Sequence, residues 1–510
     1  MNGSENKTIL RSTTQMIAKL NDMGVRYCHW KSNEHLLEGL TGDTDLDILV
    51  DKRDAAQFDA ALSELHFVRI SYPGGCIPGV DNWLGYVAGD PNYIHLHVHY
   101  DLVTGKKGVK EYHLPWANRV LASVEDSEYG FPVTAPSLEL CLLVIRICLR
   151  VNPLTLLKGF LLRRGVVSQN MLREFDYLRQ NTDQEEIARQ LDDLGIEHTV
   201  KVRILEIVNS GKIECRQLKK LRRMLMGSLN HYRSCSSLTV WRRYISFRFR
   251  DARNALRERG SQGKMCCTIR RKIPCDGGSI ITLIGADGSG KTSNLSMLYQ
   301  WLRGKLEVKL VYAGSGNGSN ELLQKLLGKI IAVYHKNTSC TQQNPGLLPD
   351  APVKMRKARL KDRAKAQVLL SAAKSKLKIM KKACRLRAMG CIVLVDRYPQ
   401  NQITGINDSP RIRAILRGVI ADHSIEKAAQ REEACFTEMT AIQPDVVIRL
   451  NVSPDVAKQR KPDHNLDYIR MKAETVSHLV FGSAKVYDID ADAPKEIVQD
   501  YIRSIIWENL

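Results

Sequence analysis

One short segment constrains the fold of this chain more than any other part of the sequence. Residues 280–293 read Ile-Ile-Thr-Leu-Ile-Gly-Ala-Asp-Gly-Ser-Gly-Lys-Thr-Ser and fit the pattern Gly-x4-Gly-Lys-Thr from Gly285 to Thr292. An apolar run precedes the pattern and a helix-like run, 294–302, follows it, which is the context that a phosphate-binding loop requires. Glycines let the N–H groups of such a loop point at phosphate oxygens beside the start of the helix. The segment predicts a nucleotide triphosphate site.

The residues of this loop have distinct predicted roles. Lys291 would contact the β- and γ-phosphates, and the Thr292 hydroxyl would bind Mg²⁺. The predicted cofactors are therefore ATP and Mg²⁺. The residues expected to surround them are Gly285, Asp287, Gly288, Ser289, Gly290, Lys291, Thr292 and Ser293.

A strand–loop–helix pattern continues from residue 279 to residue 510. Five short runs rich in β-branched residues are separated by helix-like segments, and they lie at 280–284, 309–312, 391–395, 446–450 and 485–489. Such alternation predicts a parallel sheet with helices on both faces. The predicted fold class is α/β, with an α+β domain and a helical segment before this sheet.

Four segments of the region 279–510 resemble thymidylate kinases. They are the loop at 285–292, the strand that ends in Asp396-Arg397-Tyr398, the segment 444–457 and the last strand with its acidic residues at 486–492. The resemblance implies that Asp396 lies near Mg²⁺ and the acceptor, that Arg397 holds phosphoryl oxygens, and that Arg460, Lys461 and Arg470 supply cations from a lid. The predicted catalytic residues are Lys291, Asp396, Arg397 and Arg460, and the predicted metal ligands here are Thr292 and Asp396.

Those assignments leave plainer interpretations open, and the sequence also departs from the thymidylate kinase pattern. Asp396 and Arg397 would also suit a structural ion pair, and Arg460 and Arg470 a solvated helix face. Residues 311–318 stand where that family carries an Arg-Glu-Pro-like element, and 399–410 differ from its thymine-binding segment. We therefore expect an acceptor other than thymidylate. The arrangement is more similar to thymidylate-kinase-like proteins associated with bacterial surface-polysaccharide gene sets.

A second candidate site lies near the N-terminus. Asp45 and Asp47 stand two residues apart on a predicted strand, so their carboxylates share one face and could bind Mg²⁺ for attack on an α-phosphate. With Ser32 upstream, residues 15–105 resemble the nucleotidyltransferase fold. Lys31 stands where that family has a glycine, and His95 where it has a third carboxylate. The domain is therefore either active or rebuilt, and the acidic run would also suit a plain solvated turn.

The strand at 93–98 adds a further observation. His95, His97 and His99 alternate along it and share one face, which would suit a metal or a set of hydrogen-bonded histidines. Asp101 is the nearest later carboxylate that could join Asp45 and Asp47. These alternatives stay open at the level of sequence.

The positive charge is concentrated in two segments. Residues 216–272 carry +15 and residues 354–387 carry +13, against +21 for the whole chain. The second segment has apolar residues at helical spacing and is expected to close over the acceptor, so its cations indicate an anionic small-molecule or glycan acceptor; the alternative is a solvated basic face. Nucleic acid is not an expected partner, because no aromatic strand platform accompanies the charge.

The segment 231–278 reads as a basic linker. Aromatic residues alternate with arginines at 238–250, which suits the headgroup region of an anionic membrane. The alternative is that the apolar stripe packs against one of the domains. The other predicted parts are a nucleotidyltransferase-like domain at 1–135, a helical domain at 136–230 and the thymidylate-kinase-like domain at 279–510.

The location of the protein is also predicted. No apolar run reaches the roughly 18–20 residues that span a bilayer, and the first residues lack the pattern of a secretory signal. Thirteen cysteines without a Cys-x-x-Cys pair indicate reduced thiols. We expect a cytoplasmic kinase, with peripheral contact at the inner face of the membrane as one option. The alternative function is a nucleotidyltransferase whose P-loop part only binds nucleotide as a regulator.

Overall fold

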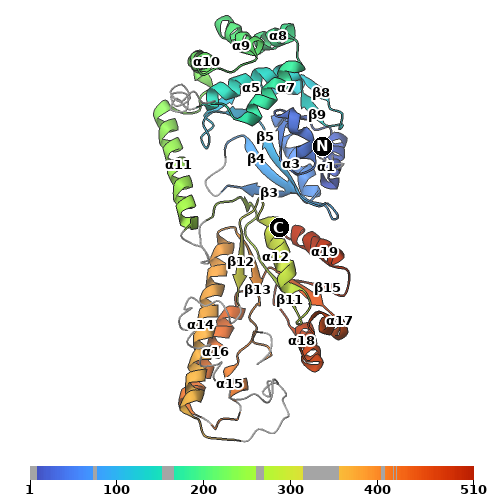
Figure 1. Ribbon diagram of the computed structural model, residues 1–510, viewed down its shortest axis with the longest axis vertical. Helices are drawn as coiled ribbons and strands as arrows, with labels where there is room; N and C mark the ends of the chain where they lie inside the picture. The colour runs from blue at the N-terminus through green and yellow to red at the C-terminus, as the bar shows by residue number, and fades with distance from the viewer. Residues whose placement is uncertain are drawn as a thin grey trace. The chain divides into compact units, whose positions relative to one another are not determined.

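The computed structural model describes residues 8–72, 77–151, 166–259, 269–313, 355–403, 408–416, 418–420 and 422–510. The chain divides into two compact units, Met1–Lys264 and Met265–Leu510, which Figure 1 colours from blue to red along the sequence. The division falls within the segment 231–278. Strands and helices alternate as the α/β prediction requires, and the fold class is confirmed.

The second unit is built on a five-stranded sheet in the order β12-β13-β11-β14-β15, in which every neighbouring pair is parallel. The strands are β11 (Ile280–Gly285), β12 (Val308–Tyr312), β13 (Ile392–Asp396), β14 (Val446–Asn451) and β15 (Lys485–Asp490). Because β11 lies between β13 and β14, the loop that follows it opens beside the carboxyl ends of both neighbours. Open parallel sheets bind ligands at this position.

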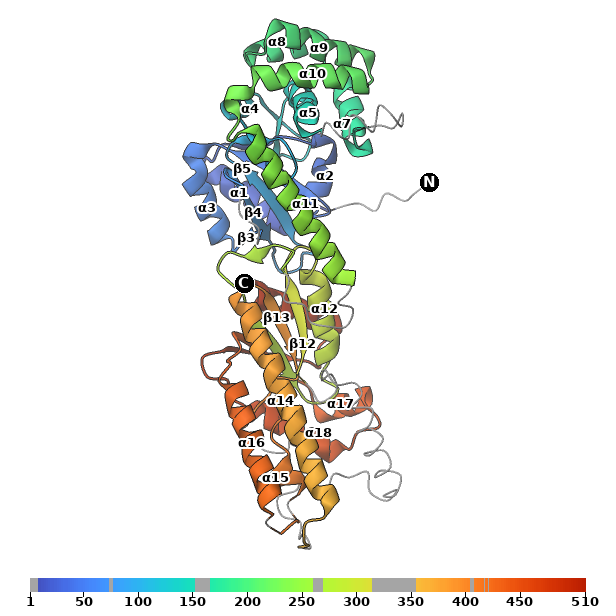
Figure 2. The same cartoon turned by 90° about the vertical axis from the view of Figure 1, so that its left-hand side faces the viewer.

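Helices cover both faces of this sheet (Figures 1 and 2). One face carries α14 (Leu360–Ala388), α16 (His423–Thr440) and α18 (Leu466–His478), whose Met380, Phe436 and Val476 share a core with the strands. The other carries α12 (Lys291–Leu302) and α19 (Lys495–Trp507), where the rings of Trp301 and Trp507 lie 6.0 Å apart. The described residues of this unit also include two short helices, α15 (Ile412–Ile415) and α17 (Pro454–Arg460). This cover explains why β11 is buried throughout.

The sheet of the first unit is mixed and runs β3-β4-β5-β2-β1-β9-β8. Its strands are β1 (Tyr27–His29), β2 (Asp45–Val50), β3 (Val68–Ser71), β4 (Val80–Gly85), β5 (Ile94–His99), β8 (Val124–Asp126) and β9 (Pro132–Thr134). β2 and β5 are parallel neighbours. Leu46, Ile48, Leu96 and Val98 enter the core with α1 (Arg11–Asp22) and α3 (Ala55–Glu64). Successive side chains of a strand point to opposite faces of the sheet. The acidic residues of β2 and the histidines of β5 therefore lie on the face away from this core.

A helical layer follows within the first unit. Its centre is α5 (Pro136–Arg150), which is buried from Ser137 to Leu149 and shares a core with α7 (Gln169–Gln180), α8 (Gln184–Asp193), α9 (His198–Ser210) and α10 (Cys215–Ser228). The unit also contains two short helices, α2 (Leu36–Leu40) and α4 (Ala117–Ala122), and an antiparallel pair of strands, β6 (Leu102–Thr104) and β7 (Tyr112–Leu114). Among the described residues, no helix combines the length and apolarity needed to cross a bilayer.

The basic segment before residue 260 forms a long helix, α11 (Ser237–Arg259). The ring of Trp241 lies 3.8 Å from the Lys106 ammonium, and Phe247 packs against Gly108, so one side of α11 contacts its own unit. Other apolar side chains of the helix are exposed, and these are Leu238, Ile245, Phe249 and Leu256. Packing against a domain thus accounts for part of the aromatic stripe, and contact of the rest with an anionic membrane stays a prediction.

Candidate functional site

The glycine-rich loop of the second unit turns sharply between β11 and α12. Gly288 and Gly290 have φ angles of 89° and 87°, a region that favours glycine. A Cβ at Gly288 would lie 2.8 Å from the Ala457 carbonyl oxygen of α17. The Ser289 hydroxyl is buried and has no hydrogen-bond partner among the residues that the structure describes. The loop therefore combines left-handed backbone at two glycines, no room for a side chain at position 288 and a buried hydroxyl without a partner, features that suit a phosphate cradle.

Lys291 begins α12, and its ammonium folds back over the loop. It donates hydrogen bonds to the Gly285 and Ala286 carbonyl oxygens at 2.8 and 2.7 Å. Burial lowers the pKa of Lys291 to about 8, an effect that the nearby Asp287 opposes and Arg397 adds to. Thr292 and Ser293 are exposed on the same first turn. A partly desolvated cation at a helix N-terminus is suited to an anionic ligand.

Cations from α17 and α18 contact the same loop. The Lys472 ammonium of α18 pairs with the Asp287 carboxylate at 2.6 Å, and His464 Nδ1 lies 3.5 Å from the same oxygen. Arg460 donates to the Ala491 carbonyl at 3.0 Å and to the Gly288 carbonyl at 3.4 Å. Arg460 therefore reaches the loop, as its predicted role requires.

The other predicted lid cations lie elsewhere. Arg470 is exposed and pairs with Asp467 within α18 at 3.6 Å, and Lys461 is exposed at the end of α17. Lys472 reaches the loop in their place. The sequence shows five Lys and Arg residues in the region 454–478 but not which of them face the loop.

Asp396 is the last residue of β13, and Arg397 follows it, beside the loop. Asp396 is buried, and its burial raises the pKa of its carboxyl group, while Arg397 and Lys291 lower it. Arg397 has a φ angle of 61°, unusual for a residue with a side chain, and its guanidinium lies 5.8 Å from the Tyr312 ring. The structure thus brings Asp396, Arg397 and Lys291 into one electrostatic environment. Strained backbone conformations that the surrounding structure maintains are often found at functional sites.

A buried ion pair that sequence reasoning missed lies next to this group. Lys376 of α14 and Asp408 are both buried, with the Lys376 ammonium 3.1 Å from the Asp408 carboxylate. Burial lowers the pKa of Lys376, and Arg411 and Arg397 lower it further. Asp408 in turn raises the pKa of Asp396. The residues of this group come from separate segments of the sequence, and no local motif predicts that they lie together.

Four other cations of the basic segment 354–387 pair with acidic residues. The pairs are Arg356–Asp362, Arg363–Asp422, Lys381–Glu438 and Arg387–Asp445. Residues 314–318 and 404–407, which carry parts of the two departures from the thymidylate kinase pattern, lie outside the described residues. A pocket of about 360 Å³ lies against Tyr398, Gln402 and Phe481 and has no loop residue in its lining. The candidate nucleotide site rests on the loop residues, which do not line this pocket.

The first unit gathers its candidate residues on β2 and β5. Asp45 lies opposite His95 and its carboxylate is 2.6 Å from His95 Nδ1. Asp47 lies opposite His97 and its Oδ1 is 2.8 Å from His97 Nδ1 and 2.8 Å from the Lys31 ammonium. The two predicted Mg²⁺ ligands are thus on one face, and each is engaged by a histidine of the neighbouring strand.

The remaining residues of this prediction lie apart from Asp47. Asp101 pairs with Lys52 at 3.8 Å beyond the end of β5, and Asp43 accepts from the Thr41 hydroxyl in an exposed turn. Ser32 is in the left-handed region, with φ of 62°, and its N–H donates to Glu174 at 3.1 Å.

A buried carboxyl group, Glu139, supports the turn after Ser32. Its Oε1 accepts from the Asn33 N–H at 3.1 Å, while Oε2 has no partner among the described residues. Burial, with Glu174 nearby, raises the pKa of Glu139 to about 8. We therefore expect Glu139 to hold its proton in the folded protein at neutral pH.

This protonation predicts a pH-dependent stability. Between about pH 4.5 and 8 the folded state holds a proton on Glu139 that the unfolded state releases, so stability falls as pH rises through this window. Glu139→Gln keeps the acceptor for Asn33 and removes the titration. The variant is expected to be more stable than wild type at pH 8 and to lose less stability between pH 5.5 and 8 in thermal unfolding. Glu125→Gln, at an exposed position of β8, serves as the control and should reproduce the wild-type slope.

Comparison with known proteins adds an independent finding. No family model matches the chain. Over 231 residues it is 27% identical to YghS, an uncharacterized ATP-binding protein of Escherichia coli K12, in a match that covers 44% of this chain and 92% of YghS. Over 228 residues it is 25% identical to YghR, an uncharacterized ATP-binding protein of the same strain, covering 42% of this chain and 81% of YghR. Over less than half of its length, the chain is similar to bacterial proteins named for ATP binding.

Proposed function

We propose that the second unit is an ATP- and Mg²⁺-dependent kinase that transfers a phosphoryl group to an anionic small-molecule or glycan acceptor. The observation that carries the proposal is the position of Lys291, at the start of α12 with its ammonium over the loop, in the electrostatic environment of Asp396 and Arg397. The similarity to ATP-binding relatives supports ATP as the nucleotide.

The loop fits a triphosphate on structural grounds. Gly288 and Gly290 leave its backbone open, the Ser289 hydroxyl lacks a partner among the described residues, and the N–H groups of α12 begin at Lys291. The Thr292 hydroxyl and the Asp396 carboxylate would hold Mg²⁺, which supplies charge neutralisation for the phosphoryl oxygens.

Cationic side chains of the chain would provide the remaining stabilisation of the phosphate charges. Lys291 would exchange its bonds to the Gly285 and Ala286 carbonyl oxygens for bonds to phosphate. Arg397 would contact the transferring phosphoryl group, and Arg460 would stabilise the loop from α17. An acceptor oxygen would then form the new bond to the γ-phosphorus as ADP leaves. Preorganised charges of this kind commonly contribute the largest part of phosphoryl-transfer catalysis.

Three cations support an anionic acceptor. Arg397 and Arg411 lie close enough to Lys376 to lower its pKa, and Arg397 also lowers the pKa of Asp396. Asp408 neutralises Lys376, so the group keeps net positive charge. A sugar phosphate or phosphorylated glycan fits this chemistry, and the resemblance to polysaccharide-associated proteins supports the same class.

The acceptor proposal predicts a selective effect of Arg411. Arg411→Gln is expected to raise the KM for a phosphorylated acceptor by about tenfold, the scale of one charge-assisted hydrogen bond, while leaving the KM for ATP unchanged. Arg413→Gln is the matched control, because Arg413 is exposed and pairs with Glu426 and Glu433. Acceptors would first be identified by mass spectrometry after incubation with ¹⁸O-labelled ATP, Mg²⁺ and a metabolite pool. Efficient, salt-insensitive phosphorylation of an uncharged sugar would contradict the acceptor class.

The alternative function, nucleotidyl transfer by the first unit, has its own discriminating result. Nucleotidylation that persists in Lys291→Ala and disappears in Asp47→Asn would favour it over the kinase. In the structure both Asp45 and Asp47 are bonded to histidines, and no separate observation favours them as a pair of Mg²⁺ ligands.

A further inference from the structure

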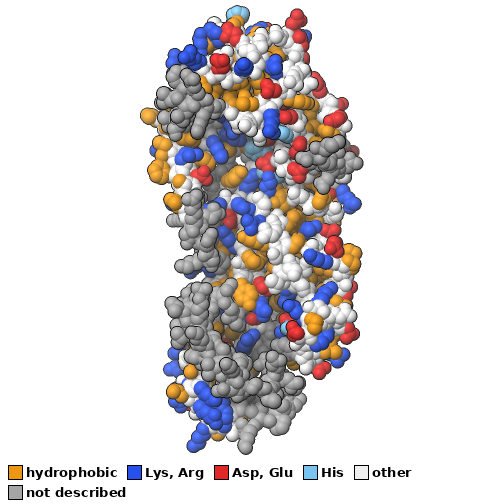
Figure 3. Space-filling view, in the orientation of Figure 1, with side chains coloured by type: hydrophobic (Ala, Val, Ile, Leu, Met, Phe, Trp, Pro, Cys, Tyr) orange, Lys and Arg blue, Asp and Glu red, His pale blue; other side chains and the backbone are white. Residues whose placement is uncertain are grey.

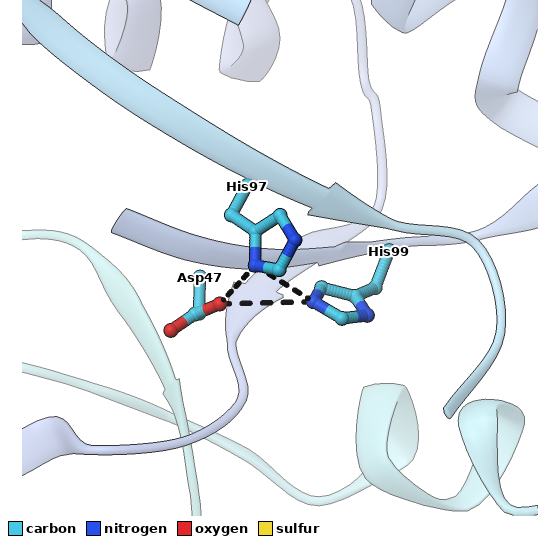
Figure 4. Close-up of side chains that lie close together, drawn as sticks. All are labelled: Asp47, His97 and His99. Atoms are coloured by element: carbon cyan, nitrogen blue, oxygen red, sulfur yellow. Dashed lines mark hydrogen bonds and ion pairs between the residues drawn. The ribbon is translucent and has the colours of Figure 1, made fainter. Parts of the chain in front are cut away.

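Three side chains on adjacent strands of the first unit bring ligand atoms to one point (Figure 4). Asp47 Oδ1 is 2.8 Å from His97 Nδ1 and 3.6 Å from His99 Nε2, and the two histidine nitrogens are 3.4 Å apart. Asp47 comes from β2, and both histidines come from β5. Among the described residues this is the cluster whose carboxylate and imidazole atoms are grouped closely enough to share one ion.

These separations match the spacing of ligands around a single metal ion. With metal–ligand distances of about 2.0–2.1 Å, neighbouring ligands of a tetrahedral site lie about 3.3 Å apart. The three measured separations bracket this value. The atoms therefore need little movement to bind one ion, and the strands that hold them are hydrogen-bonded neighbours.

The three side chains differ in how far they are exposed. The His99 ring is fixed against Trp30, with centroids 5.0 Å apart, while the side chains of Asp47 and His97 keep partial exposure. An ion can thus reach a site whose inner ligand is held in place.

We propose that Asp47, His97 and His99 form a binding site for one divalent cation that prefers nitrogen ligands, such as Zn²⁺. Two imidazoles and one carboxylate select this class over Mg²⁺, which prefers oxygen ligands. Three protein ligands leave at least one position open for water or an anionic substrate. Asp45 is not part of the site, because its carboxylate bonds to His95, whose other ring nitrogen lies 3.3 Å from Asn82.

Lys31 gives the proposal a distinctive consequence. Its ammonium lies 2.8 Å from the same Asp47 oxygen and competes with the ion for that carboxylate. Lys110 and Arg146 also lie close enough to Lys31 to interact with it electrostatically, and both add positive charge there. Removing the Lys31 charge while keeping its length should therefore strengthen metal binding.

The test is a calorimetric titration of the chelator-treated full chain with Zn²⁺ and, separately, with Mg²⁺. Wild type is expected to bind one Zn²⁺ at this site and Mg²⁺ far more weakly. Lys31→Met should tighten Zn²⁺ binding by about tenfold or more. His97→Asn and Asp47→Asn should each weaken it by at least about a hundredfold, with His113→Ala on β7 as the matched control.

A second readout separates this site from the thiols of the chain. Cobalt(II) bound to nitrogen and oxygen ligands lacks the intense thiolate charge-transfer absorption, and the His97→Asn spectrum should lose the visible bands of wild type. His97 is partly exposed, so its replacement should leave the melting temperature close to that of wild type. Zn²⁺ affinity that is unchanged in both Asp47→Asn and His97→Asn, or tighter binding of Mg²⁺ than of Zn²⁺, would overturn the proposal.

Discussion

Replacing Lys291 by alanine is expected to lower ATP turnover by at least about a hundredfold. The ammonium of Lys291 lies over the loop, held by two carbonyl oxygens at 2.7–2.8 Å, and its loss removes a preorganised electrostatic contact from the phosphates. The measurement is ADP release at saturating acceptor, with ATP affinity followed in parallel by calorimetry. Unfolding curves of the variant establish that the loss is chemical and not structural.

Lys485→Ala provides the matched control for this prediction. Lys485 is exposed at the start of β15 and, like Lys291, lies in the second unit. The control should turn over ATP at the wild-type rate. A Lys291→Ala protein with wild-type turnover would rule out the loop as the catalytic site and with it the proposed kinase.

The largest effect on stability is expected from Lys376→Met. This change leaves the Asp408 carboxylate buried without its ammonium partner, a situation that typically costs about 3–5 kcal/mol of unfolding free energy. Urea unfolding of the full chain measures the loss. Asp408→Asn in the same protein removes the stranded charge and should restore a large part of the stability.

Lys381→Met is the control that isolates burial. Lys381 lies on the same helix and pairs with Glu438, but both side chains are more than half exposed. Exposed pairs contribute about 1 kcal/mol or less. Equal losses in Lys376→Met and Lys381→Met would show that the buried pair does not anchor α14.

The sheet of the second unit could be predicted because each strand is a short, buried, β-branched run. All five predicted runs coincide with β11 to β15 to within a residue or so at either end. In the first unit the sequence pattern does not predict β4 (Val80–Gly85), because Asp81, Asn82 and Gly85 are poor strand formers. Its pairing with β3 and β5 overrides that local preference. The sequence does not predict the short strands β8 and β9 either, because Glu125, Asp126 and Pro132 are uncommon in strands.

The candidate sites also differ in how far the sequence predicts them. The loop residues are contiguous in sequence, so their proximity follows from the motif. The sequence does not distinguish Lys472 from Arg470 as the residue that faces the loop. The two residues are two positions apart on α18, so their side chains differ by about 200° in direction. Only the packing of α18 decides which of them faces Asp287. The Lys376–Asp408 pair and the Asp47–His99 contact join residues dozens of positions apart. They depend on strand order and helix packing, which the sequence does not display.

The close approach of α17 to the loop changes how sequence variation among relatives should be interpreted. A side chain at position 288 would collide with the backbone at Ala457, and the positive φ angle disfavours one in any case. Glycine at 288 would thus be retained even in a descendant that had lost its nucleotide. The Lys291 side chain meets no comparable packing requirement, since its partners are loop carbonyl oxygens. In an alignment of relatives, Gly288 would record the architecture of the loop, and Lys291 would record whether selection still acts on phosphate binding.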